Sequence, residues 1–490
     1  MEATKLLIGG EMVTLYKVSD CFAVFLRDGG KYSNDIRIVP VNNSENLDYL
    51  MEELRQARGN EVISHLYNSD MISGEKVLPL DTITVQFKDG TSCVLRFQIF
   101  NKFGLEVIEQ ISYLPRSYTV RLTSFSKRNP LKIVSELRKH KEIKIAEPDL
   151  STQVSLNYIP SDTLYKDQWY LNNSGGTYSL KAGADVKAEG AWKFTKGVRS
   201  VRVCIIDNGF NLSHPDLVAM DKIVAAKEFG SAKSKKDITH GTACALLAVA
   251  EENGQGMVGL APKCSLMPLS MPTWLSDNIY IEMLQYAMDN FADVISCSWS
   301  TSAWNFPLST KLKALLHKVS TEGRRNKKGC IIIFAAGNEN RPINGNKDGH
   351  ASHHGFAIYP DVIAVGASNS LDRRASFSNY GKELTVCAPS YGFPGKEINV
   401  PQYTDSNEQH QLYKIGGTSC STALVAGLVA LVLSVNPDLS SSEVKRIIIE
   451  TADKIDLNNA NYDTNGHSEY FGFGRINAQK AVEMAMKTKC

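Results

Sequence analysis

The stretch that decides the fold reads GGTSCSTA at residues 416–423 and is followed by the apolar run LVAGLVALVL at residues 424–433. The apolar run predicts a buried helix, and the two glycines allow a tight turn before it. Ser419 then lies in the first turn of that helix, where backbone N–H groups have no intrahelical partner. A serine placed there can act as a nucleophile beside a free N–H donor, or it can simply cap a core helix.

Two further segments predict apolar strands that end in a polar side chain. The run VRVCII at residues 201–206 is followed by Asp207, and the run CIIIFAA at residues 330–336 is followed by Gly337 and Asn338. Runs of this kind are typical of central parallel strands covered on both faces. We therefore predict an α/β fold with a doubly wound, mostly parallel sheet. Because ligands bind at the carboxyl ends of such strands, Asp207 and Asn338 are expected at the rim of one crevice.

A histidine motif, HGTACA at residues 240–245, begins a predicted helix between these two strands. With it, the chain resembles the subtilisin-type (subtilase, peptidase S8) serine proteases, which carry aspartate, histidine and serine motifs in this order along the chain. Supporting similarity lies at HPDL (214–217), GMVGLAP (256–262), YPDVIAVGA (359–367) and FGFGRINA (471–478). The resemblance covers about residues 165–490 and implies a subtilisin-like catalytic domain.

The resemblance also implies a reaction and a role for each residue. Ser419 would attack a peptide carbonyl after His240 removes its proton, and Asp207 would hold the imidazole in the useful tautomer. The Asn338 amide and the Ser419 N–H would stabilise the oxyanion. The implied activity is that of a serine endopeptidase that works through an acyl-enzyme. Taken singly, these residues could instead cap a turn, fill the core or occupy a left-handed position.

The sequence departs from the family pattern at several positions near these motifs. Asn208 replaces the usual Ser or Thr, Ala423 replaces a proline after the nucleophile, and Leu424 replaces a frequent histidine. Trp299 stands where the family has a smaller residue lining substrate pockets, and its alternative role is packing. Since the lost proline could slow turnover, a catalytically weak or inactive peptide-binding protein of the same fold remains an alternative. An esterase or amidase with the same triad is another.

The resemblance further implies a structural calcium site, although an ordinary polar loop is an equal alternative. Calcium prefers oxygen ligands from side chains and from backbone carbonyls. The predicted ligands are the side chains of Asp216, Asn253 and Gln168 and the carbonyls of Glu251, Gln255 and Met257. No cofactor is expected in the catalytic step.

The N-terminal third predicts a separate, smaller α+β region. Strands are predicted at 82–87, 118–122 and 143–146, with an apolar segment at 94–100 and a helix at 131–137. Residues 76–150 resemble the inhibitory pro-domain of subtilisins, which implies an intramolecular inhibitor and a latent precursor. Residues 151–165 are interpreted as an exposed linker that would be cut, before a catalytic domain at 166–490. Residues 1–75, with strands near 5–8 and 22–26 and a helix near 47–57, receive no predicted function, and an extension of the pro-domain or a regulatory module would both fit.

Composition limits the possible functions. The formal net charge is +2, and no basic stripe indicates a nucleic-acid partner. No apolar run is expected to reach membrane-spanning length, and the first residues lack the apolar core of a signal peptide. The ten cysteines have no framework spacing, so we expect free thiols in a reducing compartment. Together these features favour a cytoplasmic location, and the expected partners are protein or peptide substrates.

Overall fold

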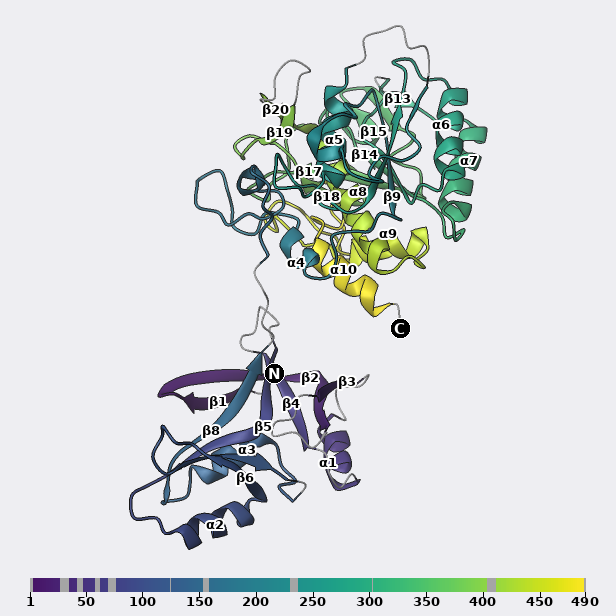
Figure 1. Cartoon of the computed structure of the whole chain (residues 1–490). Helices are drawn as coiled ribbons and strands as arrows, with labels where there is room; N and C mark the ends of the chain where they lie inside the picture. The colour runs from purple at the N-terminus through teal and green to yellow at the C-terminus, as the bar shows by residue number, and fades with distance from the viewer. Residues whose placement is uncertain are drawn as a thin grey trace. The chain divides into compact units, whose positions relative to one another are not determined.

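The computed structural model of the chain describes residues 3–26, 35–41, 47–57, 62–68, 76–123, 125–152, 158–229, 237–301, 303–402 and 411–488. The chain divides into two compact units, residues 1–157 and 158–490 (Figure 1). This division falls inside the segment predicted as a linker. That segment is shorter than predicted, because residues 150–152 continue a strand of the first unit and residues 158–165 pack on the second.

The N-terminal unit is built on one eight-stranded antiparallel sheet. The strand order is β1-β2-β4-β5-β7-β6, with β3 paired to β2 and β8 paired to β5. The strands are β1 (Ala3–Ile8), β2 (Glu11–Leu26), β3 (Asp35–Pro40), β4 (Val62–Asn68), β5 (Lys76–Phe87), β6 (Leu105–Gln110), β7 (Ser117–Leu122) and β8 (Ile143–Thr152). The helices are α1 (Leu47–Ala57), α2 (Cys93–Lys102) and α3 (Pro130–Leu137).

Strand β5 joins the two segments that the sequence suggested as separate parts. Its first two residues pair with β4, residues 82–86 pair with β7, and β8 pairs with residues 77–79 and 83–87. A single hydrophobic cluster contains Phe25 from β2, Val85 from β5 and Val134 from α3. Residues 1–75 therefore share a core and a sheet with residues 76–150. The apolar segment at 94–100 forms α2, whose N-cap Ser92 accepts a hydrogen bond from the Leu95 N–H at 3.3 Å.

The second unit contains a seven-stranded parallel sheet in the order β10-β11-β9-β12-β14-β17-β18. Its strands are β9 (Arg202–Asp207), β10 (Lys227–Glu228), β11 (Ser265–Ser270), β12 (Val294–Cys297), β14 (Ile331–Ala335), β17 (Val362–Ser368) and β18 (Val386–Pro389). From β9 the chain first builds outward through β10 and β11, and then returns to the other side of β9 with β12. The order of strands thus reverses at β9 and β12, and the crevice beyond their carboxyl ends is the expected ligand site.

Helices cover both faces of this sheet. The helices α4 (Ala188–Trp192), α5 (Thr239–Val249), α8 (Gly417–Val435), α9 (Ser441–Glu450) and α10 (Ala478–Lys487) contribute to one hydrophobic cluster. The helices α6 (Asp277–Asp289) and α7 (Thr310–Glu322) contribute to the cluster on the opposite face and lie side by side (Figure 1). This arrangement is the doubly wound α/β architecture that the apolar strands predict.

Helix α8 is the central helix of the unit. Its 19 residues have a mean hydropathy of 2.0 over their apolar window, which is long and apolar enough to cross a membrane. The sequence analysis did not anticipate a run of that length. However, 89% of the window is buried inside the unit, so the apolar surface of α8 is already covered by protein.

Two small sheets flank the main one. Strands β13 (Asn305–Phe306), β15 (Asn344–Lys347) and β16 (His350–His354) form the first, and β19 (Ile398–Gln402) and β20 (Gln411–Ile415) form the second. The second leads directly into the glycines that precede α8. The nine described cysteines are all free thiols, and eight of them are buried.

Candidate active site

The first pair of predicted site residues is in contact. Asp207 is the last residue of β9, and His240 lies in the first turn of α5. The His240 Nδ1 lies 2.9 Å from Asp207 Oδ1 and 3.0 Å from Oδ2. Asp207 is only 2% exposed, whereas the imidazole of His240 keeps a 32% exposed side chain. The buried Asp207 carboxylate is therefore hydrogen-bonded to Nδ1, while part of the imidazole ring of His240 remains exposed to solvent.

The surroundings of His240 favour its protonated form. Burial by itself would lower the pKa of His240, but the hydrogen bond and the negative charge of Asp207 outweigh it, with a smaller contribution from Asp237. The pKa of His240 is therefore raised above its ordinary value. This shift is the one expected for an imidazole that must accept a proton and hold it briefly.

Ser419 lies in the first turn of α8 and is 6% exposed. Its hydroxyl donates to the Ser298 carbonyl at 2.8 Å, and the Ser298 hydroxyl donates back to the Ser419 carbonyl at 3.2 Å. Ser298 directly follows β12, so this pair connects the end of a central strand to the start of α8. Within the described residues, no hydrogen bond joins Ser419 to His240. In the absence of substrate, catalytic hydrogen bonds are often long or poorly aligned.

Asn338 is fixed by the residue that precedes the serine. Its Oδ1 accepts hydrogen bonds from the Thr418 N–H at 2.7 Å and from the Thr418 hydroxyl at 3.0 Å. Thr418 Oγ1 also accepts the Gly337 N–H at 3.2 Å. Because Oδ1 is held in this way, Nδ2 is left as a donor, with no hydrogen-bond partner among the described residues. Gly417 has φ +79°, and a Cβ there would lie 3.0 Å from this Nδ2, so the turn needs glycine.

The four predicted residues thus come from different elements that meet at the carboxyl edge of the sheet. Asp207 and Asn338 follow parallel strands, whereas His240 and Ser419 begin the helices α5 and α8, which pack against each other. The arrangement brings together a hydroxyl, an imidazole oriented by a carboxylate, and an amide donor. Chemically, it can activate a serine and stabilise an oxyanion.

Trp299 packs as the alternative interpretation suggested. Its indole N–H donates to the Ile206 carbonyl at 2.9 Å, and its ring stacks on Tyr280 with centroids 5.5 Å apart. The rings of Phe334 and Phe356 meet it edge to face at 5.0 and 5.5 Å. Trp299 therefore belongs to an aromatic cluster beside β9 and β14.

The predicted cation loop is compact. Asp216 is fully buried, and its Oδ2 accepts the Met257 N–H at 3.0 Å. The Asn253 side chain accepts the Gln255 N–H on Oδ1 at 2.9 Å and donates from Nδ2 to Asp216 Oδ1 at 3.4 Å. A Cβ at Gly256 would collide with the Asp216 carboxylate, so the loop can close on Asp216 only with glycine there. Carboxylate, amide and carbonyl oxygens are the donor set that a hard cation requires.

A second carboxylate at this loop was missed by the sequence analysis. Asp162 is 4% exposed, and its Oδ1 accepts the Asn253 N–H at 3.2 Å, while its Oδ2 is buried without a hydrogen-bond partner. Burial raises the pKa of Asp216 to about 7, and the nearby charge of Asp162 adds to this shift. Two neighbouring buried carboxylates, one of which has an oxygen without a hydrogen-bond partner, fit a bound cation. Asp162 was overlooked because it falls within the predicted linker, although the apolar residues around it indicate a packed segment.

Gln168, the remaining predicted side-chain ligand, is engaged elsewhere. Its Nε2 donates to the Tyr170 hydroxyl at 2.7 Å and to the Val258 carbonyl at 2.8 Å. Its Oε1 accepts the Val258 N–H at 3.0 Å. Both ends of the Gln168 amide are therefore hydrogen-bonded within the protein, whereas the Asp162 carboxylate lies at the loop.

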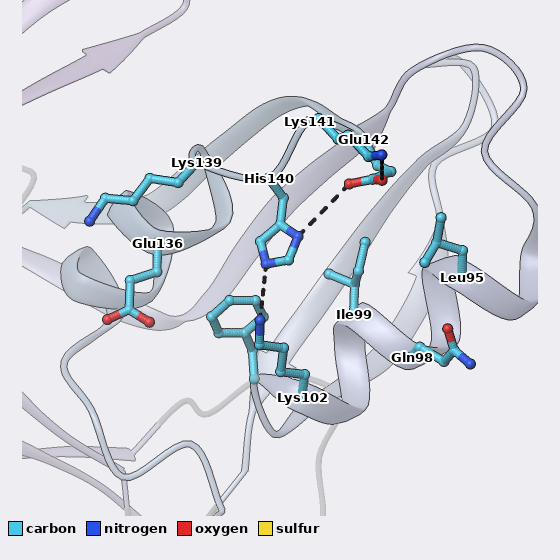
Figure 2. Close-up of a pocket in the computed structure, with 10 residues that line it drawn as sticks. Leu95, Gln98, Ile99, Lys102, Glu136, Lys139, His140, Lys141 and Glu142 are labelled. Carbon is cyan, nitrogen blue, oxygen red and sulfur yellow. Dashed lines mark hydrogen bonds and ion pairs between the residues drawn. The ribbon is translucent and has the colours of Figure 1, made fainter.

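A separate pocket lies in the N-terminal unit. Its lining residues, between 95 and 142, are distant in sequence from the predicted site residues. It has a volume of about 810 Å³ and lies between α2 and the segment that follows α3 (Figure 2). His140 is bracketed there by Lys102 at 3.5 Å and Glu142 at 3.9 Å, as Figure 2 shows. The lining has glutamates near the histidine but no serine, threonine or cysteine that could serve as a nucleophile. The cavity is therefore not the candidate active site.

The family model described as the Subtilase family matches residues 199–474, which is more than half of the chain. The chain therefore belongs to the subtilase family. The matched segment contains Asp207, His240, Asn338 and Ser419 together.

Individual relatives agree with this assignment. The "Calcium-dependent protease" of Nostoc sp. is 30% identical over 451 residues, which cover 85% of this chain and 65% of that protein. This chain thus spans less than two thirds of the length of that relative. Subtilisin DY of Bacillus licheniformis is 33% identical over 289 residues, which cover 58% of this chain and 91% of that protein. The crystal structure of the serine protease of Aeromonas sobria matches with a TM-score of 0.54 at 22% identity, over 67% of this chain and 68% of that one, and supports the fold.

Proposed function

We propose that this chain is a serine endopeptidase that hydrolyses peptide bonds with Ser419, His240 and Asp207. The observation that carries the proposal is the contact between His240 Nδ1 and the buried Asp207 carboxylate, at 2.9 Å, at the sheet edge where Ser419 begins α8. Two named relatives, a calcium-dependent protease and a subtilisin, support the same activity.

In the proposed reaction, substrate binding turns the Ser419 hydroxyl from the Ser298 carbonyl toward His240 Nε2. The hydroxyl oxygen attacks the peptide carbonyl carbon while Nε2 takes its proton, and the Asp207 carboxylate stabilises the resulting imidazolium. The imidazolium then protonates the leaving amine as the carbon–nitrogen bond breaks. A water molecule, deprotonated by the same nitrogen, hydrolyses the acyl-enzyme.

Charge that develops on the carbonyl oxygen needs donors already in place. Asn338 Nδ2 and the backbone N–H of Ser419 are the proposed pair. Thr418 supports this role because its N–H and hydroxyl both donate to Asn338 Oδ1, which leaves Nδ2 available as a donor. Since the donors are fixed before substrate arrives, little reorganisation is needed during the reaction.

We also propose a structural calcium ion at the loop that closes on Asp216. Its ligands would be the side chains of Asp162, Asp216 and Asn253 and the carbonyls of Glu251, Gln255 and Met257. The support is the paired buried acids, the unpartnered Asp162 Oδ2 and the similarity to the calcium-dependent protease of Nostoc sp.. The ion would neutralise the two carboxylates and stiffen the loop, without taking part in the chemistry.

The N-terminal unit is proposed to be an intramolecular inhibitor of a latent precursor. The support is that residues 1–157 fold as a compact unit with their own core, separate from the unit that contains Ser419. Cleavage between residues 149 and 165 would release it.

A fluorophosphonate probe tests the proposed activity directly, because it labels only a serine activated by its neighbours. Because the full chain is proposed to be latent, we expect the chain cleaved between residues 149 and 165 to be labelled at Ser419, and the same cleaved chain with Ser419→Ala to stay unlabelled. If the full chain and a chain cleaved between residues 149 and 165 both stay unlabelled, the alternative of a peptide-binding protein without catalysis is supported. The specific observation in favour of that alternative is that Ser419 donates to Ser298 rather than to His240.

A further inference from the structure

We propose that Asp207, His240 and Cys244 form a binding site for a thiophilic divalent cation such as Zn²⁺, which switches the enzyme off. The ligand atoms of these three side chains all lie within 4.8 Å of one another. In the described part of the chain, this is the one group of three His, Cys, Asp or Glu side chains with that geometry.

The secondary structure explains why the three side chains meet. Cys244 lies four residues after His240 in α5, so the two share one face of the helix, one turn apart. Asp207 reaches the same point from the end of β9. Asp207 and Cys244 are buried, at 2% and 0% exposure, whereas His240 leaves its outer edge accessible. A cation would therefore enter past the imidazole.

The three donor atoms are those that zinc prefers. Zinc binds imidazole nitrogen, thiolate sulfur and carboxylate oxygen, and three protein ligands leave one position for water. The charges also balance, since a divalent cation with one carboxylate, one thiolate and a neutral imidazole carries no net charge. This balance matters in a buried site, where an uncompensated charge is costly.

Binding would move protons in a defined way. The cation displaces the proton of the Cys244 thiol, which goes to solvent, as the sulfur–metal bond forms. The lone pair of His240 Nδ1 binds the metal, so the one proton of the neutral ring resides on Nε2. That nitrogen is the atom that must accept the proton of Ser419, and a protonated Nε2 cannot do so. The metal would thus stop the reaction without touching the serine.

Cys244 has no other evident role in the reaction. Burial raises the pKa of its thiol well above its ordinary value, and the nearby Asp207 charge adds to the shift. The thiol is therefore protonated and unreactive without a metal. Metal coordination deprotonates a thiol outright, so the residue responds to thiophilic cations in particular.

Binding is tested on the Ser419→Ala protein, with saturating calcium to fill the loop at Asp216. We add Cd²⁺, a spectroscopic substitute for Zn²⁺, and expect one ion per chain, an ultraviolet thiolate-to-metal charge-transfer band and release of one proton. Adding Cys244→Ala should abolish the band. Adding Cys330→Ala, which removes another buried thiol, should leave it intact. A band that survives Cys244→Ala would overturn the site.

The inhibitory consequence rests on the proposed proteolytic function and needs a separate measurement. Zn²⁺ should inhibit peptide hydrolysis by the wild-type chain, and a zinc-selective chelator should restore it. Cys244→Ala should remain active and require a Zn²⁺ concentration more than about tenfold higher for the same inhibition. Equal inhibition of both proteins would overturn the proposed switch. Metal binding to a chain that never cleaves peptides would instead leave the site standing and refute the proposed function.

Discussion

Ser298 and Ser419 exchange hydrogen bonds: the Ser419 hydroxyl donates to the Ser298 carbonyl at 2.8 Å, and the Ser298 hydroxyl donates to the Ser419 carbonyl at 3.2 Å. These two hydrogen bonds connect Ser298, which directly follows β12, to the first turn of α8. It also gives the proposed nucleophile a partner other than His240. Ser419 must therefore change partner before it can react, and substrate binding is the event that we expect to cause this change.

Replacing Thr418 by Val should impair catalysis without removing any residue of the triad. The variant loses the hydroxyl that donates to Asn338 and accepts the Gly337 N–H, so the amide donor becomes less well oriented. We expect kcat to fall about tenfold with little change in KM, because the donor acts mainly in the transition state. Steady-state kinetics on one peptide substrate measure both constants.

The Asn338→Ala variant is the reference for that experiment. Removing the amide should cost kcat about 10²–10³-fold, a range measured on a subtilisin rather than derived from this chain. The Thr418→Val effect should be smaller than this and should not add to it in the double variant. Full additivity would mean that Thr418 acts through something other than Asn338.

Activity should depend on pH through His240. The imidazole must be neutral to accept a proton, and its pKa lies above the ordinary value because of Asp207. We expect kcat/KM to rise with pH along an acid limb whose midpoint lies above 6.5. An Asp207→Asn variant should lower kcat by about 10⁴. Its residual activity should have an acid limb at lower pH, and an unshifted limb would show that Asp207 does not set this pKa.

Calcium should stabilise the chain most at neutral and alkaline pH. In the ion-free protein the pKa of Asp216 is raised from 3.8 to about 7, so the folded state binds more protons than the unfolded state between these values. Ion-free stability should therefore fall as pH rises from about 4 to 7, by up to about 4 kcal/mol. Thermal unfolding at several pH values, with calcium or with a chelator, measures this loss.

The matched variant for the calcium experiment is Asp162→Asn. It removes one of the two adjacent charges and supplies a weaker ligand, so we expect higher ion-free stability at pH 8 together with weaker calcium binding. Gln168→Glu, at a residue whose amide is committed to Val258 and Tyr170, should not strengthen calcium binding. Stronger calcium binding in Gln168→Glu would return that residue to the site.

Much of the catalytic unit could be predicted because its signals are local. Asp207 and Asn338 each follow a continuous apolar run that predicts a parallel strand, and Ser419 begins a continuous apolar helix. Because the carboxyl ends of parallel strands lie at one edge of the sheet, the residues could be placed together at that edge. The bond between Ser419 and Ser298 could not be predicted, because spacing along the chain does not specify a side-chain rotamer.

Other features depended on contacts between distant segments. Asp162 reaches the cation loop from a position 91 residues earlier than Asn253, within the segment interpreted as a linker. Residues 1–75 and 76–150 share a core because β4 pairs with β5, and no local sequence pattern predicts that pairing. Gln168 was assigned by resemblance alone, and its actual partners become apparent only in the folded chain.

The most direct test of the central claim is the intact mass of the purified chain over time, with the wild type beside Ser419→Ala. If Ser419 is the nucleophile and the N-terminal unit is removed by the enzyme itself, the wild type should break between residues 149 and 165 while the variant stays whole. Cleavage of both proteins at the same rate would mean that another protease makes the cut. A wild type that stays whole and also fails to react with a fluorophosphonate after removal of residues 1–157 would contradict the account.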